Sequence, residues 1–270
     1  MSKIIQETLA LLKAGYSERF KDVTIEKMNA GIFMTVVKLS TGYSGISITN
    51  VDKSEGCHRS RNKYFGPFSP GQVHGQKVTD LFKQTEGNEL LDVIKLAVMN
   101  AISSEIIEHS AYRIVEDKDP VELLDLSTPK KIVIVGAFHS YVKRFADSEH
   151  QLSVLELNEK ALAPDYRRFY VPAADSTATM KHADIIIITG STLANNTLDE
   201  LLANIPSGAM VVVVGPTSSL IPDILFSKGV NIIGATRIQD AELAFTMVGE
   251  GAAGYHLFQR CAKKICLLNG

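Results

Sequence analysis

Apolar and polar positions in the first fifty residues follow a helical period and then a strand period. Ile5, Leu9 and Leu12 fall on one helical face and predict an opening helix. Three short strand-like runs come next, at 23–28, 32–37 and 43–48. Because short turns separate these runs, the pattern predicts an antiparallel meander.

A second helical pattern, at 88–107, is apolar nearly all round. A helix of this kind is buried on more than one side. Asn100 falls on its apolar surface, beside Val93 and Leu96. The sequence therefore predicts a buried amide with a specific hydrogen-bond partner.

From residue 131 onward, strand-like runs alternate with helical patterns. The predicted strands are 131–135, 153–157, 184–189, 210–214 and 231–235. Regular alternation of this kind predicts a mostly parallel sheet with helices on both faces. One of the helical patterns, 197–203, begins with Thr197 and Glu200 at the spacing of a capping box.

A charged, proline-containing stretch at 116–127 separates the two patterns and is the best linker candidate. The predicted fold class is α/β with two domains. Residues 1–115 form a smaller α+β domain that contains the antiparallel meander. Residues 128–270 form a Rossmann-like domain with a mostly parallel sheet.

Composition narrows the classes of partner. A hydrophobic content of 45% and a charged content of 21% are ordinary for a globular protein. The net charge of −2 gives no basic footprint for nucleic acid. No apolar run approaches the roughly 20 residues that cross a bilayer, and the N-terminus lacks signal-peptide features. The three cysteines show no paired framework, which favours reduced thiols and a cytoplasmic location.

Small polar turns follow four of the predicted strands, at Gly136–Ser140, Gly190–Thr192, Gly215–Ser219 and Gly234–Thr236. In a parallel α/β sheet, ligands bind where the carboxyl ends of the strands open into such turns. The sequence therefore predicts a small-molecule site at this edge of the sheet.

The first of these turns lacks most of the dinucleotide fingerprint. Gly136 occupies the first glycine position, but Phe138 and Tyr141 occupy the second and third. The second glycine lets the backbone approach pyrophosphate and the third lets helix and strand pack closely. Classical NAD or FAD binding is therefore disfavoured.

Two ionisable residues near this turn are candidates for acid–base or ligand roles. Glu156 lies 20 residues after Gly136, the spacing at which an acidic residue takes ribose hydroxyls. The alternative is that Glu156 only occupies a strand end. His139 is the second candidate, because histidine acts as an acid, a base or a metal ligand near neutral pH. The alternative is that His139 is an ordinary surface residue.

The second and third turns are rich in hydrogen-bonding groups. Gly190 is followed by Ser191, Thr192 and Asn195, and Gly215 is followed by Pro216, Thr217 and Ser218. Hydroxyls and free N–H groups at helix starts are typical of an anion site, but also of ordinary N-capping. Their occurrence at neighbouring strand ends favours one shared pocket.

A long segment with little apolar periodicity, 52–77, is a candidate lid. It carries Cys57, His58, Arg59 and Arg61, a cluster suited to closing over an anionic ligand. The alternative is a solvated charged loop. Adjacent Cys57 and His58 lack the further ligands at the spacing of a structural zinc site.

The stretches 183–202, 214–219 and 238–240 resemble the "Putative heavy-metal chelation" family, and the resemblance runs through the whole chain. It implies a Rossmann-like domain after a domain similar to the N-terminal domain of enolase. It also implies a cleft between the domains, capped by the loop at 52–77, and a heavy-metal ion as a candidate cofactor. The chain departs from the family pattern at Ser219 and Leu220, which precede Pro222.

These observations lead to a hypothesis of function. The chain binds a small anionic or metal-chelating molecule between its two domains. One alternative is a nucleotide- or S-adenosylmethionine-dependent transferase, and another is a non-catalytic metal carrier. Whether the protein is an enzyme, and whether it forms a homo-oligomer through its apolar faces, stays open at this point.

Overall fold

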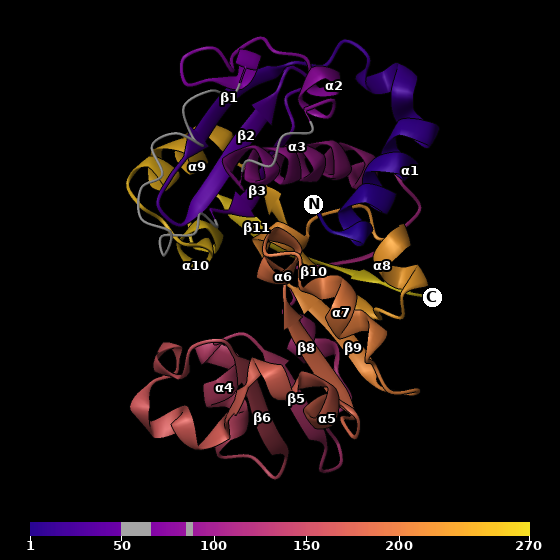
Figure 1. Cartoon of the computed structure of the whole chain (residues 1–270), viewed down its shortest axis with the longest axis vertical. Helices are drawn as coiled ribbons and strands as arrows, with labels where there is room; N and C mark the ends of the chain where they lie inside the picture. Colours follow the sequence, from indigo (N-terminus) through magenta and orange to yellow (C-terminus); the bar gives the residue numbers. More distant parts are fainter. Residues whose placement is uncertain (50–65, 85–88) are drawn as a thin grey trace.

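The computed structural model describes residues 1–49, 66–84 and 89–270. The N-terminal part contains the helices and strands α1 (Lys3–Phe20), β1 (Ile25–Ala30), β2 (Met34–Leu39), β3 (Ser44–Ile48), α2 (Val78–Leu81) and α3 (Glu89–Glu108). The three strands form an antiparallel sheet in the order β1-β2-β3. The predicted meander and both predicted helices are therefore confirmed (Figure 1).

The rest of the described chain forms a second, larger sheet with its helices. Its strands are β4 (Arg113–Glu116), β5 (Lys131–Val135), β6 (Gln151–Glu156), β7 (Tyr170–Pro172), β8 (Ile185–Thr189), β9 (Met210–Val214), β10 (Ile232–Ile238) and β11 (Ala262–Leu268). Its helices are α4 (His139–Ala146), α5 (Ser176–Met180), α6 (Ser191–Ala194), α7 (Leu198–Ala203), α8 (Asp223–Ser227), α9 (Ala241–Gly249) and α10 (Gly254–Phe258). Short 3₁₀ turns include η2 (Pro120–Leu123), η4 (Pro164–Phe169) and η6 (Pro216–Ser218).

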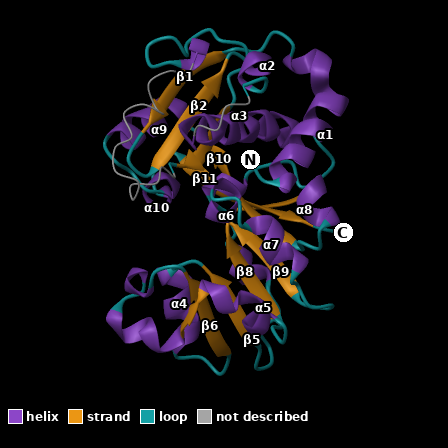
Figure 2. Ribbon diagram, in the orientation of Figure 1, coloured by secondary structure: helices purple, strands orange, loops and turns teal. Residues whose placement is uncertain are grey.

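The larger sheet has the order β4-β11-β10-β9-β8-β5-β6-β7. Strands β5 to β10 run parallel, whereas β11 is antiparallel to both β10 and β4. The predicted α/β class with a mostly parallel sheet is confirmed (Figure 2). The parallel part has the doubly wound order, so its topological switch point lies between β5 and β8.

Alternate residues of the parallel strands enter two different cores. Ile186 and Ile188 of β8 join the core that also contains α1 and α3, and Ile185 and Ile187 join the core beneath α4. Helices on both faces of the sheet explain why these strands are apolar at every position. One hydrophobic core thus runs from the N-terminal helices into the larger sheet.

The small sheet is also buried on both faces, by elements far apart in sequence. Val37 and Leu39 of β2 join the core around α3, whereas Met34 and Val36 pack with Phe245 of α9. Figure 1 shows α9 and α10, near the end of the chain, beside β1 and β2. The antiparallel sheet therefore lies between a helix that precedes the larger sheet and one that follows β10.

Two local predictions are wrong. The predicted turn Gly234–Thr236 lies inside β10, which continues to Ile238 because it pairs with β11 along its whole length. Thr197 precedes α7 in a helical conformation without a side-chain cap, since its hydroxyl bonds to Asn195 instead. In sequence, β4 coincides with the end of the first predicted domain. The division of the chain at 116–127 stays a prediction.

Candidate functional site

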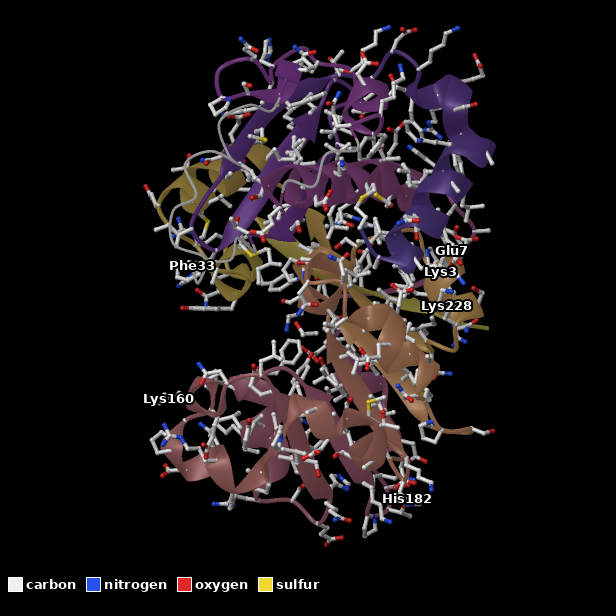
Figure 3. The ribbon with its side chains drawn as sticks, viewed as in Figure 1. Lys3, Glu7, Phe33, Lys160, His182 and Lys228 are labelled. Atoms are coloured by element: carbon white, nitrogen blue, oxygen red, sulfur yellow. The ribbon has the colours of Figure 1, made fainter. Side chains whose placement is uncertain are left out.

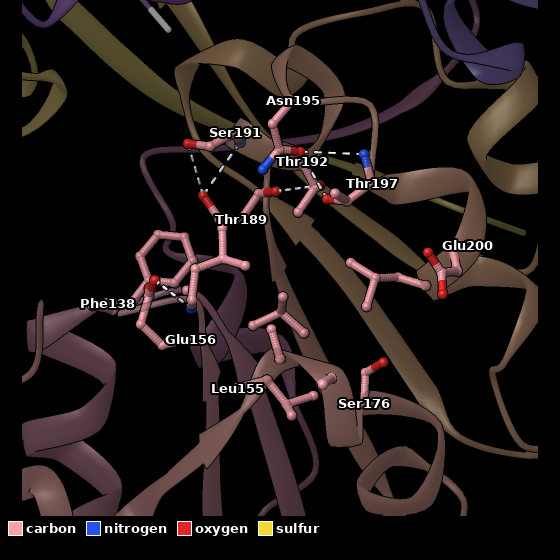
Figure 4. A pocket seen from close by; sticks show the side chains of 17 residues that line it. Phe138, Leu155, Glu156, Ser176, Thr189, Ser191, Thr192, Asn195, Thr197 and Glu200 are labelled. Carbon is pink, nitrogen blue, oxygen red and sulfur yellow. Dashed lines mark hydrogen bonds between the residues drawn. The ribbon is translucent and has the colours of Figure 1, made fainter. Parts of the chain in front are cut away.

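The turns after β5 and β8 meet at the topological switch point of the sheet. They enclose a cavity of about 590 Å³, here called the switch-point cavity, which Figure 4 shows from close by. Of the predicted site residues, its lining includes Gly136, Phe138, Glu156, Ser191, Thr192 and Asn195. The structure therefore brings together the first two predicted turns and the end of β6.

Gly136 is required by the shape of the first turn. Its φ of 101° is in the region that favours glycine, and a Cβ there would lie 2.9 Å from Cγ2 of Thr189. The close approach places the end of β5 directly against the end of β8. Gly190 is similarly close to the next turn, since a Cβ added at this position would lie 3.0 Å from the backbone nitrogen of Ser218.

Two of the predicted hydroxyl donors already donate within the protein, and a third accepts a hydrogen bond. Thr192 donates to the carbonyl of Thr189 (2.6 Å), and Ser218 donates to the carbonyl of Gly215 (2.7 Å). Thr217 accepts the backbone N–H of Ile48 (2.9 Å). All three side chains are buried, so these hydroxyls hold the turns in shape.

Two other hydroxyls lie at the wall of the switch-point cavity. Thr189 Oγ1 donates to Oγ of Ser191 (3.2 Å) and accepts the backbone N–H of Ser191 (3.3 Å). Asn195 turns its Oδ1 toward Thr197, accepting from the hydroxyl of that residue (2.7 Å). The dashed lines in Figure 4 mark these bonds.

The charge of the switch-point cavity is negative. Among the described residues that line it, only Glu156 and Glu200 carry a charge. Oε1 of Glu156 accepts the backbone N–H groups of Leu157 (2.7 Å) and Asn158 (3.3 Å), which fixes the carboxylate at the end of β6. This arrangement suits a hydroxylated or cationic group and disfavours a carboxylate or phosphate.

A second cavity, of about 660 Å³, adjoins the first and is here called the hairpin cavity. Ile32, Phe33 and Met34 at the β1–β2 hairpin line one side, and α10 contributes Gly254 and Tyr255. Phe33 lies near the end of this hairpin (Figure 3). From the predicted site it includes Phe138, His139, Ser191, Gly215, Pro216 and Thr217.

The first turn of α4 faces the hairpin cavity. Its lining includes His139, Ser140 and Tyr141, so the positive end of the α4 dipole adjoins the cavity. His139 is exposed and begins the helix. A negatively charged group is favoured here more than in the switch-point cavity.

A network of three side chains forms the wall beside α4. Asp119 accepts from the Tyr141 hydroxyl (2.7 Å) and pairs with the Lys264 ammonium (2.8 Å). Burial, followed by the charge of Asp119, raises the pKa of Tyr141 above its ordinary value, so the phenol stays protonated. The Asp119 carboxylate therefore holds the Lys264 ammonium in a fixed place, and the two opposite charges form an ion pair in the wall of the cavity.

Sequence reasoning missed several residues of the hairpin cavity, chiefly Phe33, Asp119, Tyr255 and Lys264. Asp119 lies in the predicted linker, and Lys264 lies in β11, a strand that the patterns did not predict. Phe33 and Tyr255 are large apolar residues that are 53% and 64% exposed, a property that only the fold reveals. Nothing in the local sequence pattern marks these residues as neighbours.

The proposed lid residues Cys57, His58, Arg59 and Arg61 lie outside the described residues. Across 1–49, 66–84 and 89–270, no group of three or more His, Cys, Asp or Glu side chains is arranged to hold a metal ion. Within these same ranges, none of the helices has the length and apolarity that a membrane crossing needs.

Comparisons with known proteins find matches for both the N-terminal part and the larger-sheet part of the chain. Two family models, both described as "Putative heavy-metal chelation", match residues 14–103 and 119–267. A curated relative, an uncharacterized protein of Methanocaldococcus jannaschii, is 28% identical over 171 residues, or 63% of this chain. The match covers 62% of that relative, less than two thirds of its length.

Two solved structures share the whole fold. One, a protein of unknown function from Pyrococcus horikoshii, has a TM-score of 0.75 at 19% identity, with 99% of this chain and 98% of that chain covered. The other, from Desulfitobacterium hafniense, has a TM-score of 0.72 at 19% identity, with 98% of both chains covered. Both are described as members of the DUF364 family, and at this identity the likeness shows the fold alone.

Proposed function

The chain belongs to the family described as "Putative heavy-metal chelation", and from this premise we propose that it binds a small, anionic, metal-chelating molecule in the hairpin cavity. The observation that carries the proposal is the composition of the cavity wall. It combines large apolar surfaces with the positive end of the α4 dipole and with Lys264, whose ammonium is paired with Asp119 in the same wall. Pockets of this kind hold an apolar ligand body and orient it by a few polar groups.

The proposal assigns metal coordination to the bound molecule. The described residues contain no ready-made group of metal ligands, so this chain's own contribution is to hold the chelator. Lys264 and the first turn of α4 would take its acidic group, and Phe33, Phe138 and Tyr255 would cover its apolar surface. The molecule would then lie between the two predicted domains.

The test begins with mass spectrometry of any small molecule released when the purified full chain is denatured, together with elemental analysis. Binding of that molecule is then measured by calorimetry. Lys264→Ala is expected to weaken it by about tenfold or more, because a hydrogen bond to a charged group is lost. Lys263→Ala is the matched control, since Lys263 pairs with Asp117 and does not line the cavity.

Two results would contradict the proposal. One is a released molecule that binds equally well to Lys264→Ala and to the unaltered chain. The other is a stoichiometric metal that survives removal of every organic molecule. The second result would favour a metal carrier.

A second candidate function, a nucleotide- or S-adenosylmethionine-dependent transferase, is supported by Glu156. Its fixed carboxylate lines the switch-point cavity at the position where doubly wound folds hold a ribose. Stabilisation of the chain by adenosine-containing cofactors in a thermal-shift screen would favour this candidate. No shift with any of them would count against it.

A further inference from the structure

The two cavities share a wall made by a few residues. Ala137, Phe138, Thr189 and Ser191 line both of them. Phe138 is the only one of the four with a large side chain. The largest side chain in the wall that the two cavities share is therefore the Phe138 ring, here called the barrier.

The Phe138 ring packs against a second aromatic ring, that of Tyr141. The Phe138 ring lies 5.1 Å from the Tyr141 ring, with 31° between their planes. Tyr141 is itself fixed by its hydrogen bond to Asp119. The barrier is thus held in place by the same network that fixes Lys264.

The cavities on the two sides of this ring differ in chemistry. The described part of the switch-point lining carries two carboxylates and no cationic side chain. The hairpin cavity carries the Asp119–Lys264 ion pair, the start of α4 and several aromatic side chains. A single ligand that matched both would need a hydroxylated or cationic end in the first cavity and an apolar end in the second.

Exposed apolar side chains mark both openings. Of the five large hydrophobic residues that are exposed in the described chain, Ile32, Phe33 and Tyr255 line the hairpin cavity, and Leu157 lines the switch-point cavity. Leu157 is 77% exposed and directly follows Glu156. Apolar surface left open at a cavity mouth is typical of a binding site.

We propose that the protein binds two ligands at once, separated by Phe138 and nearest to each other beside Thr189 and Ser191. The ligand of the switch-point cavity is a hydroxylated, uncharged or cationic molecule, such as a nucleoside. The ligand of the hairpin cavity has an apolar body and an acidic group. This inference rests on the proposed function for the hairpin cavity and adds a second reactant, which favours a two-substrate enzyme over a carrier.

The test uses one probe for each cavity with the full chain. Adenosine probes the switch-point cavity, and 1-anilinonaphthalene-8-sulfonate, an aromatic body with one anionic group, probes the hairpin cavity. Fluorescence titration of the sulfonate is carried out with and without saturating adenosine. We expect both probes to bind, and adenosine to change the dissociation constant of the sulfonate by less than about threefold.

Variants assign each probe to its cavity. Glu156→Gln is expected to weaken adenosine by about tenfold without affecting the sulfonate, and Lys264→Ala is expected to do the reverse. Glu159→Gln and Lys263→Ala are the matched controls, because neither residue is among those that line these two cavities. Phe138→Ala removes the largest side chain of the shared wall, so adenosine is expected to change the dissociation constant of the sulfonate by more than about threefold.

Phe138→Leu keeps a shorter barrier and should retain simultaneous binding. Phe169→Ala, which removes a ring outside both linings, should behave like the unaltered chain. Competition between the probes in the unaltered chain would overturn the inference. Sulfonate binding that depends on Lys264, without any binding of adenosine, would overturn the two-ligand inference and leave the proposed function intact. Sulfonate binding that Lys264→Ala does not weaken would contradict both the inference and the proposed function.

Discussion

The side-chain amide of Asn100 donates to the backbone carbonyl of Thr217 over 3.1 Å, and so joins α3 to the turn after β9. The same amide donates to the carbonyl of Ile46 (2.7 Å) in β3. Asn100 is 1% exposed. One buried side chain therefore ties the small sheet, the N-terminal helices and one wall of the hairpin cavity together.

Replacing this amide should destabilise the whole chain. Asn100→Ala leaves two buried carbonyl oxygens without their donor, so the free energy of unfolding should fall by about 1–3 kcal/mol. Urea denaturation followed by circular dichroism measures the change. Asn204→Ala, which removes an exposed amide bonded to Glu200, is expected to cost no more than about 0.5 kcal/mol. Equal losses in the two variants would contradict the role assigned to Asn100.

The contact between β3 and α3 depends on a glycine. A Cβ at Gly45 would lie 2.2 Å from the carbonyl oxygen of Ala97 and from the nitrogen of Ala101. Gly45→Ala should therefore cost about 3 kcal/mol, because backbone on both sides must move. Gly15→Ala, in the open part of α1, has nothing within 4 Å and should stabilise the chain by about 0.5–1 kcal/mol. Thermal unfolding of the two variants should shift in opposite directions.

The packing of α9 on the small sheet predicts a single cooperative unit. Phe245 is buried against β2, so Phe245→Ala should lower the free energy of unfolding by about 3–5 kcal/mol. Hydrogen exchange should show faster opening in β1 and β2 as well as in α9. Acceleration confined to α9 would show that the small sheet is stable without it.

Buried thiol and phenol groups predict a loss of stability at high pH. Burial, with Asp119 and Glu122 nearby, raises the pKa of Cys266 from an ordinary value near 9 to about 12. The unfolded chain loses this proton first, so the stabilising contribution is complete below pH 9 and disappears as the pH rises toward 12. The free energy of unfolding should therefore fall over this range.

Cys266→Ala should make that fall shallower. Burial also raises the pKa of Tyr112 and Tyr141, and both phenols titrate in the same sense, so part of the slope should remain. At pH 8, Cys266 and Cys261 should resist alkylation in the folded chain and react after denaturation, because both are buried. Rapid alkylation of Cys266 in the native protein would contradict this account.

The sequence predicts well the elements whose signal is local. The strands at 131–135 and 210–214 coincide with β5 and β9, since fully buried parallel strands are continuous apolar runs. The buried amide at Asn100 was also predicted, because a polar residue on an apolar helix face needs a partner. The turns at Gly136 and Gly190 are also recognisable from the local sequence, and they lie at the switch point.

Features that depend on distant segments were not predicted. β4 and β11 pair across about 150 residues of chain, and α9 completes the core of a sheet that forms near the N-terminus. Thr192 and Ser218 have the residue types of ligand donors, but their hydroxyls donate to the carbonyls of Thr189 and Gly215 once the chain has folded. Only the three-dimensional contacts decide whether such a hydroxyl is available.

The most direct test of the binding site is a crystal structure of the full chain soaked with 1-anilinonaphthalene-8-sulfonate. The account predicts the aromatic rings between Phe33, Phe138 and Tyr255, with the sulfonate beside Lys264 and the first turn of α4. Ordered density for the probe only elsewhere, such as the groove beside Met210 and Lys228, would contradict it.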